Sequence, residues 1–398
     1  MINNVTARYL AALSARQKVW FIVGILSAIL ISIVGIIYES DNTERADKQF
    51  TTSMSIREIA VSLDITPKGL ARELDLSLDI PKGKPLNRIG ISQQQLDQGI
   101  DHILSHQSTR TKYYIFTAIS LFGLIYLARL GRPGNTDISL RSLWYPRTLY
   151  IVCLLIAVIV CGFALGKSPN PMEGTVKVFK SMVGLYPSII EKVLAFIFFT
   201  FLAVVGNKLI CGWACPFGGL QELIYSIPVF RRLKQRKLSF ALTNLIRGGL
   251  FAATLLMLFG IIGNRKGFVI YHYLNPFNLF DLDFDHWLIL TTVVVFLVLS
   301  IFTYRPFCHF ICPFGFVSWI MERFSLIKVK IDKEKCTNCG LCVQACPTQA
   351  AKDRVSGKLF GADCFSCARC LNVCPQDAIR YSSVFSKQMN KGNCNANV

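Results

Sequence analysis

The sequence CTNCGLCVQACP, residues 336–347, returns as CFSCARCLNVCP in residues 364–375. Each copy reads C-x2-C-x2-C-x3-C-P, a spacing typical of domains that bind two iron–sulfur clusters. Three thiolates two residues apart can reach three corners of one cubane, while the fourth, at the start of a helix, points at the other cluster. The spacing therefore predicts two [4Fe–4S] clusters. The predicted ligands are Cys336, Cys339, Cys342 and Cys374 for the first cluster, and Cys364, Cys367, Cys370 and Cys346 for the second.

Zinc held by four thiolates is the alternative interpretation of these cysteines. A zinc site would use two C-x2-C pairs and would not need the third cysteine and the C-x3-C-P ending of each copy. Iron–sulfur clusters are therefore favoured. Because two clusters in one small domain come without a substrate pocket or nucleophile, the chain is expected to be an electron-transfer subunit rather than a stand-alone enzyme.

A shorter cysteine motif occurs twice upstream, as CGWACPFG in residues 211–218 and CHFICPFG in residues 308–315. Each motif ends one half of an internal repeat, residues 147–227 and 247–324, which pairs two apolar segments with an aromatic loop between them. Pseudo-symmetric packing of the two halves, as a four-helix bundle, would bring the four cysteines together. They could then hold a further metal centre, act as two dithiol pairs or bind Cu(I), and two equivalent copies argue against simple packing. The candidate residues are Cys211, Cys215, Cys308 and Cys312.

Composition excludes a purely soluble protein. Of 398 residues, 52% are hydrophobic and only 17% are charged, against about 25% charged in typical soluble domains. Six segments are apolar enough, and nearly long enough, to cross a hydrocarbon core of about 30 Å as helices. The predicted spans are residues 20–38, 113–127, 149–166, 193–210, 248–263 and 287–304.

The basic residues predict the orientation of these spans. The net charge is +19, and all of it lies in the N-terminal tail, the second and fourth connecting loops and the C-terminal tail. The other three loops sum to zero. Since basic loops stay in the cytoplasm, both termini are expected there, and the charge indicates membrane topology rather than nucleic-acid binding. No cysteine falls in an outer loop, so metal ligation is favoured over disulfides.

The remaining segments suggest few sites. Residues 51–106 show helical periodicity on the outer side and predict a small helical domain, either a partner-docking unit or a spacer. The aromatic loop at residues 268–287 predicts interfacial anchoring, with a quinone or flavoprotein contact as the alternative.

Haem is not expected, because the histidines lie in loops or at helix ends. His102 and His106 are expected on a solvated face. His309 is a candidate donor beside the second short motif. Cys153 and Cys161 are expected to pack in the core.

The expected fold is a multi-pass α-helical membrane protein with about six spans and a C-terminal α+β domain of the two-cluster ferredoxin type. Its predicted parts are a cytoplasmic tail with the first span (1–40), an extracytoplasmic helical domain (41–112), the main membrane domain (113–325), the ferredoxin domain (326–381) and a polar tail containing Cys394 (382–398).

Residues 147–381 carry a combination of membrane helices, two C-x3-C-P motifs and a C-terminal ferredoxin pattern. This combination resembles the membrane polyferredoxin family that includes NapH, of periplasmic nitrate reduction, and the membrane half of NosR, of nitrous oxide reduction. It is also similar to the CcoG/RdxA proteins of cytochrome oxidase assembly. The resemblance implies a protein of the bacterial inner membrane that moves electrons between the quinol pool or a cytoplasmic donor and an extracytoplasmic reductase or flavoprotein.

Two other functions fit the same motifs. One is a copper-binding and copper-reducing assembly factor of the CcoG type, in which the four cysteines of the short motifs bind the metal. The other is an Rnf-like export of electrons from cytoplasmic ferredoxin. A quinone within the bilayer would help any of these schemes, because about 30 Å of hydrocarbon separates a cytoplasmic cluster from an outer acceptor.

Overall fold

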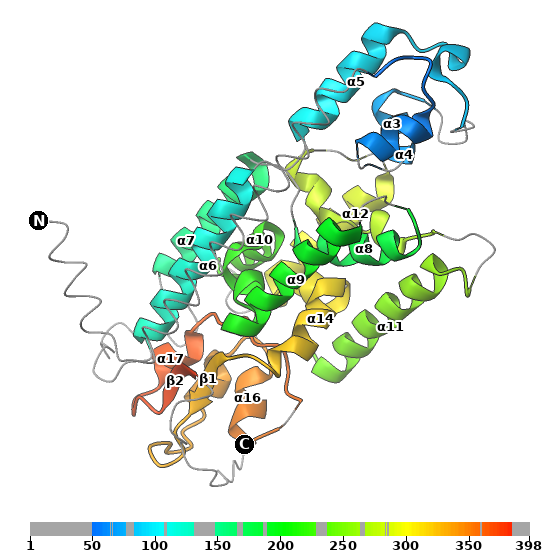
Figure 1. Ribbon diagram of the computed structural model, residues 1–398. Coiled ribbons are helices and arrows are strands. Elements are labelled where there is room, and N and C mark those ends of the chain that lie inside the picture. Colours follow the sequence, from blue (N-terminus) through cyan, green and yellow to red (C-terminus); the bar gives the residue numbers. More distant parts are fainter. Residues whose placement is uncertain are drawn as a thin grey trace, which may run out of the picture.

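A computed structural model gives the arrangement of the chain (Figure 1). A helical middle region lies between a small helical unit, which comes early in the sequence, and a unit with two strands, which comes late in the sequence. The described residues are 50–63, 65, 67–76, 83–106, 110–130, 148–164, 170–185, 189–227, 237–262, 267–282, 284, 286–358 and 360–383. The predicted span 20–38 and Cys394 lie outside these residues.

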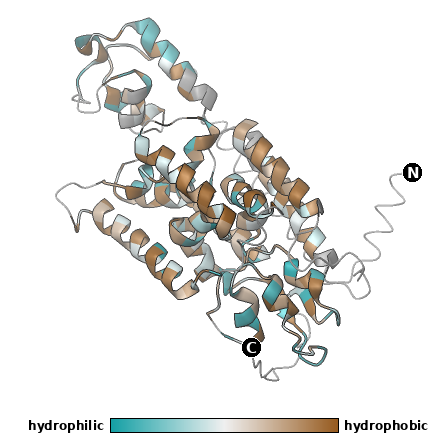
Figure 2. Cartoon of the chain, turned by 180° about the vertical axis from the view of Figure 1, so that it is seen from behind, coloured by the Kyte–Doolittle hydropathy of each residue, from teal (hydrophilic) through white to brown (hydrophobic). Residues whose placement is uncertain are grey.

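Five apolar helices form the middle region. They are α6 (Arg110–Leu130), α7 (Thr148–Val158, continued by a π-helix at Ile159–Ala164), α9 (Ile189–Gly206), α11 (Phe240–Leu258) and α12 (Trp287–Phe302). Within the described residues, α9 and α11 are long and apolar enough to cross a membrane, and the apolar parts of the other three are shorter. All five expose large apolar side chains, among them Ile125, Ile159, Ile190, Leu245 and Val294. Figure 2 shows this apolar surface around the middle of the molecule, which is typical of contact with lipid.

Two of these helices differ from their predicted limits for identifiable reasons. Helix α9 ends at Gly206 rather than at residue 210, because Asn207 and Lys208 adopt left-handed backbone angles, with φ of 56° and 60°. Helix α11 starts at Phe240 rather than at residue 248, and it contains Arg247, a residue that hydropathy places outside a span. Arg247 is completely buried and lies 3.2 Å from the Asp363 carboxylate, which compensates its charge.

Short helices after each cysteine motif hold the two repeats together. Helix α10 (Pro216–Tyr225) ends the first repeat and packs against α7 and α12, while α14 (Pro313–Glu322) ends the second and packs against α9 and α11. Each therefore contacts one apolar helix of its own repeat and one of the other. The expected four-helix bundle is thus replaced by an arrangement in which α10 and α14 lie between the spans.

Three further short elements complete the middle region. Helix α8 (Pro171–Met182) connects α7 to α9 and packs against α9, α14 and α11. Helix α13 (Pro306–Phe310) carries the second cysteine motif, and 3-10 helices at Ile270–His272 and Pro276–Phe280 form the loop before α12. Phe277 and Phe280 of that loop are buried, so this part of the aromatic loop folds inward, whereas Phe268, Tyr273 and Trp287 are exposed.

The C-terminal unit is a small α+β domain docked on the helices. Strands β1 (Ile327–Ile331) and β2 (Ile379–Ser383) pair antiparallel, with Ile331 opposite Ile379. Between them lie α15 (Leu341–Ala345), α16 (Ala350–Val355) and α17 (Arg369–Val373). Strand β1 packs on α9, and β2 packs on α6. From β2 the Tyr381 hydroxyl also donates to the carbonyl of Gly206, at the end of α9.

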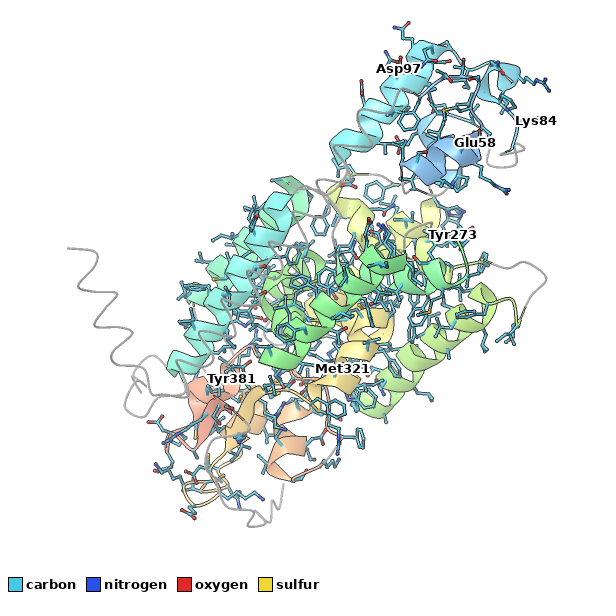
Figure 3. The ribbon with its side chains drawn as sticks, viewed as in Figure 1. Glu58, Lys84, Asp97, Tyr273, Met321 and Tyr381 are labelled. Atoms are coloured by element: carbon cyan, nitrogen blue, oxygen red, sulfur yellow. The ribbon has the colours of Figure 1, made fainter. Side chains whose placement is uncertain are left out.

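The N-terminal unit comprises α3 (Ile56–Ser62), α4 (Pro67–Glu73), a 3-10 helix at Leu86–Ile89 and α5 (Gln93–His106). Its apolar side chains form a separate core that includes Ile56, Ile59, Leu70, Leu86 and Leu96. Figure 3 shows Glu58, Lys84 and Asp97 in this unit, distant from Tyr381 in the C-terminal unit. The unit therefore lies at the end of the molecule opposite the ferredoxin-type domain (Figure 1).

Candidate metal centres

Four cysteines of the C-terminal unit line one cavity. They are Cys336, Cys339, Cys342 and Cys374, the set that the spacing assigns to the first cluster. Cys339 is exposed, and Cys374 is buried. This cavity therefore lies against solvent on one side and against the domain core on the other.

A second cavity is lined by Cys346, Cys364, Cys367 and Cys370, the set assigned to the second cluster. The Cys342, Ile331 and Ile379 side chains line both cavities, so the two sites share a wall. The cysteine that follows each short helix reaches across to the other site: Cys346 follows α15, and Cys374 follows α17.

Backbone geometry in the two cysteine loops follows one pattern. Asn338 and Gly340 in the first loop have positive φ angles, as do the equivalent Ser366 and Ala368 in the second. This winding directs backbone N–H groups at the sulfurs: those of Val343, Ser366 and Arg369 bond to Cys342, Cys364 and Cys367, and that of Ala378 lies 3.3 Å from the Cys374 sulfur. Amide donors of this kind stabilise negative charge on cluster-bound sulfur.

Burial raises the pKa of four cysteine thiols in these sites, those of Cys342, Cys364, Cys367 and Cys370. For Cys342 and Cys364 the pKa is raised to about 11, with opposing amide or guanidinium contributions too small to compensate. Such thiols stay protonated at neutral pH unless a metal displaces the proton, since thiolate is the ligating form. The chemistry of the donor set therefore suits iron ligation, and not a free, reactive thiolate.

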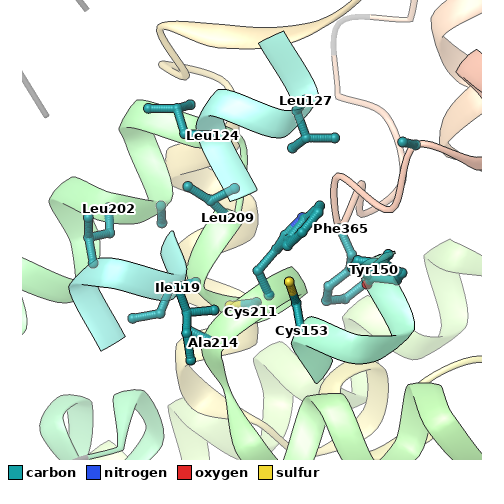
Figure 4. Close-up of a cluster of buried hydrophobic side chains, with 14 of the residues drawn as sticks. Ile119, Leu124, Leu127, Tyr150, Cys153, Leu202, Leu209, Cys211, Ala214 and Phe365 are labelled. Atoms are coloured by element: carbon teal, nitrogen blue, oxygen red, sulfur yellow. The ribbon is translucent and has the colours of Figure 1, made fainter. Parts of the chain in front are cut away.

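The four cysteines of the short motifs come together in a third cavity, as the internal repeat suggests. Cys211, Cys215, Cys308 and Cys312 line it. Cys211 lies in a π-helix at Ile210–Ala214, Cys308 lies in α13, and the other two immediately precede α10 and α14. Three further side chains complete the wall: Met172 of α8, Phe277 of the aromatic loop and Phe365 of the ferredoxin-type domain. Figure 4 shows Cys211 and Phe365 within one buried cluster, together with Tyr150 and Cys153.

The two halves of this third site are related by the repeat. Gly218 faces the carbonyl of Cys211 and the guanidinium of Arg305, and Gly315 faces the carbonyl of Cys308 and the guanidinium of Arg247. A Cβ atom at either glycine would lie about 3 Å or less from these groups. Glycine is therefore required where each arginine reaches a cysteine carbonyl.

Two buried ion networks surround the third site, and sequence reasoning missed both. Glu222 accepts from Arg305 at 3.0 Å and from Arg369 at 2.6 Å. Burial alone would raise the pKa of Glu222, but the two guanidinium groups outweigh it and the pKa is lowered. Because all three charges are buried, removing one would leave the others uncompensated.

Asp363 is the centre of the second network. Its carboxylate pairs with Lys208, with Arg247 at 3.2 Å and with His309 at 3.3 Å. Burial opposes ionisation of Asp363, yet Arg247 and Lys208 hold its pKa well below the usual range. The sequence holds one sign of these networks, because Lys208 and Arg305 occupy equivalent positions before the two motifs. In the structure both residues have left-handed backbone angles and no exposed surface.

The ferredoxin-type domain docks directly on the first short motif. The Phe365 carbonyl lies so close to Gly212 that a Cβ atom there would be 2.1 Å from it. The Trp213 indole donates to the carbonyl of Ser366 at 3.1 Å, and the Asn207 amide donates to that of Cys364 at 3.1 Å. The loop of the second cysteine set is thus held against the turn that carries Cys211.

Gly212→Ala is expected to separate these two segments, because the backbone atoms that meet there cannot move independently. Overpacking of this kind typically costs about 1–3 kcal/mol. Hydrogen–deuterium exchange should show faster exchange in residues 362–370 of the variant. Gly249→Ala is the control, since a Cβ atom at Gly249 of α11 would meet nothing within 4 Å; equal protection in both variants would contradict the docking.

The spacing of the ligands matters for the kind of metal. Among the residues that the structure describes, no group of three or more His, Cys, Asp or Glu side chains is spaced to hold a single metal ion. A cubane distributes its four thiolates over four iron atoms, whereas one zinc ion gathers all its ligands at about 2.3 Å. Each of the two ferredoxin-type cavities is lined by the four cysteines that a cubane requires.

Other predicted residues occupy structural positions. Cys153 and Cys161 are buried in the α7 region, in line with their expected packing role. His309 pairs with Asp363 and lies edge-on to the Phe365 ring at 5.4 Å, so it supports the third site from beside Cys308. His102 and His106 lie on α5, but their side chains are outside the described set.

Comparisons with known proteins agree with these sites. A family described as "4Fe-4S binding domain" matches residues 192–237 and 285–333, which include both short motifs, and a second family of that description matches residues 329–352. An uncharacterised protein of Methanocaldococcus jannaschii is 30% identical over 48% of the chain and 69% of its own length. The ferredoxin-type protein NapH of Haemophilus influenzae is 29% identical over 43% of the chain, and the regulatory protein NosR of Stutzerimonas stutzeri is 33% identical over 36%. The chain spans 59% and 20% of these two relatives. No solved structure matches it.

Proposed function

Since the chain belongs to the NapH/NosR-type family of ferredoxin-type proteins, and is thereby an iron–sulfur electron-transfer protein, we propose that it relays single electrons across the bacterial inner membrane. The donor is the quinol pool or a cytoplasmic carrier, and the acceptor is an extracytoplasmic redox protein. Both termini face the cytoplasm in this proposal, which places the ferredoxin-type domain on the side of the donor. The basic tail and loops support that orientation.

One observation carries the proposal: two cavities with a shared wall are each lined by a complete set of four cysteines. A [4Fe–4S] cluster, when bound, takes up and releases one electron without a change in its ligands. Cys336, Cys339, Cys342 and Cys374 would hold the first, and Cys346, Cys364, Cys367 and Cys370 the second. The amides around the sulfurs stabilise the negative charge, and the apolar side chains of Ile331 and Ile379 limit the access of water between the sites.

Exposure distinguishes the two sites. Cys339 of the first set is exposed, whereas the second set lies against the membrane helices. An external carrier can therefore approach the first site most closely, and the second site connects it to the interior of the protein. If reduced ferredoxin is the donor, the protein exports electrons from the cytoplasm, as in an Rnf-like system. If quinol is the donor, the electrons enter the protein within the bilayer.

Anaerobically purified protein is expected to contain at least about eight irons and eight sulfides per chain, because two cubanes require four of each. Chemical iron and sulfide analysis, with EPR of the reduced protein, measures this. Cys336→Ser combined with Cys374→Ser should remove about four irons, and Cys161→Ala should remove none. Substantially fewer than eight irons in the wild type, or zinc in their place, would contradict the cluster assignment.

Mixing the protein with reduced ferredoxin or with quinol, and following the cluster absorbance, identifies the donor. A reporter fused after Val398 tests the orientation, and activity on the outer side would overturn it.

A further inference from the structure

We propose that Cys211, Cys215, Cys308 and Cys312 hold a third [4Fe–4S] cluster, through which electrons leave the ferredoxin-type domain for the opposite face of the helical region. This inference rests on the proposed electron-transfer function and adds a centre within the helices. Sequence reasoning left the role of these cysteines open among a metal centre, dithiol pairs and copper. Four observations on the described residues favour the cluster.

Hydrogen-bond donors reach all four sulfurs. The N–H of Gly315 lies 3.3 Å from the Cys312 sulfur, and that of Gly218 bonds to Cys215 at the equivalent position. The Gln221 amide donates to Cys308 at 3.7 Å, and Ser318, at the equivalent position in the other repeat, reaches Cys211. Small cysteines that merely pack in a core have no need of matched donors, whereas cluster-bound sulfur carries negative charge that donors stabilise.

The charge around the cavity points to an anionic ligand set. Lys208, Arg247 and Arg305 have no exposed surface, and each donates to a backbone carbonyl within the two motifs. Their networks join five cations to three carboxylates, and the two cations in excess, Arg354 and Arg369, line the neighbouring second cavity. The members are Lys208, Arg247, Arg305, Arg354 and Arg369, with Glu222, Glu322 and Asp363. Buried charge without compensation is strongly destabilising, and clusters bound by four thiolates supply the compensating negative charge.

The position of the cavity makes it a continuation of the two ferredoxin-type sites. Phe365 lines both the second and the third cavity, so the two cavities are adjacent at this residue. On the other side the wall consists of Met172 and Phe277, which belong to the two connections that the charge pattern places outside the membrane. The third site therefore lies between the cytoplasmic domain and inward-folded segments of the outer loops. A cluster there would shorten the distance that an electron has to cross between the cytoplasmic clusters and an outer acceptor.

The family match supports iron rather than copper at this position. Both segments matched by the first "4Fe-4S binding domain" family include a short motif, and the four cysteines of these motifs are the only cysteines in the matched residues. The proposed step moves one electron: the reduced second cluster returns to its oxidised state as the third cluster is reduced. The external donor supplies that electron, and the outer redox protein removes it.

Iron content tests the proposal. The wild-type protein is expected to hold about twelve irons per chain, and Cys211→Ser combined with Cys308→Ser should hold about eight, with the ferredoxin-type EPR signals retained. The control is Cys153→Ser combined with Cys161→Ser, which alters two buried cysteines that line none of the three cavities. A wild type with eight irons would overturn the third cluster and leave the proposed function standing, whereas fewer than eight would overturn both. Copper or zinc bound by the wild type and lost from the Cys211/Cys308 variant would also overturn the third cluster.

Ser318 acts as a positioning residue for this centre. Its hydroxyl donates to the Gly315 carbonyl at 3.1 Å and is also within hydrogen-bonding reach of the Cys211 sulfur, so the two acceptors share one proton. Ser318→Ala should shift the reduction potential of one of the three centres to lower values at unchanged iron content, because a donor to sulfur favours the more negative reduced state. Ser318→Thr should restore the potential, and Ser300→Ala, which removes a buried hydroxyl bonded to Phe296, should leave it unchanged. Equal potentials in the Ser318→Ala and Ser300→Ala proteins would refute this role.

Discussion

Replacing Glu222 with alanine is expected to lower the free energy of unfolding by about 3–5 kcal/mol, since the substitution leaves two buried guanidinium groups without their carboxylate. Arg305 and Arg369 both bond to Glu222, and none of the three side chains has more than 2% of its surface exposed. Arg369 belongs to the ferredoxin-type domain and Arg305 to the second repeat, so Glu222 joins three parts of the molecule. Denaturant unfolding in detergent, followed by tryptophan fluorescence, measures the loss.

Glu191→Ala is a matched control. Glu191 forms a partly exposed pair with Lys192 at 3.4 Å, and pairs of this kind contribute about 1 kcal/mol or less. Glu222→Gln, which keeps the shape and removes the charge, should lose nearly as much stability as Glu222→Ala. A loss at Glu222 no larger than that at Glu191 would show that the network does not stabilise the fold.

The same network predicts the pH dependence. The pKa of Glu222 is lower in the folded protein than the value of about 4.3 in an unfolded chain. Its contribution to stability is therefore complete above that unfolded value and is lost as the pH falls through the lower folded value. Between pH 5 and pH 7 the contribution of Glu222 to stability should not change. The difference in unfolding free energy between the wild type and Glu222→Gln should therefore stay constant across this range.

Cys364→Ala combined with Cys367→Ala is expected to abolish electron transfer from the cytoplasmic donor to the outer acceptor. The variant removes half of the second ligand set, about four irons, and leaves the first set intact. Rapid mixing with the donor should still reduce the first site, while reduction of an acceptor on the other side falls to background. Transfer at the wild-type rate would show that electrons bypass the second site.

The sequence predicted the ligand sets because cluster chemistry imposes a local spacing. The eight cysteines of the C-terminal motifs line two cavities, with each predicted set of four in one cavity and Cys342 at the wall of both. The repeat also anticipated the meeting of the four upstream cysteines. Membership of the NapH/NosR-type family is confirmed, whereas six membrane spans and the orientation remain predictions.

The buried charges could not be predicted in the same way. Hydropathy treats Lys208, Arg247 and Arg305 as polar residues outside spans, but each is buried beside a carboxylate that is distant in sequence. Lys208 and Arg247 also entered the charge difference that predicts the topology. The same loop keeps an excess of basic residues without them, namely Arg231, Arg232, Lys234, Arg236 and Lys237, so the orientation does not depend on the buried pair.

Long-range docking was also beyond a sequence pattern. Nothing in Gly212 itself shows that the backbone of residue 365 passes against it, because such a contact depends on the arrangement of two separate domains. The first motif begins Cys-Gly-Trp, whereas the second begins Cys-His-Phe. This difference is the one sign in the sequence that the two motifs have different neighbours.

The contacts of Ser366, Tyr381 and Leu326 with the end of α9 tether the ferredoxin-type domain at several points. A domain fastened in this way cannot swing between its donor and its acceptor, as mobile carrier domains do. In the proposed relay, a cytoplasmic donor therefore has to diffuse to the exposed edge around Cys339. The concentration and surface charge of that donor, rather than a hinge motion within this chain, then determine how often the first site is reduced.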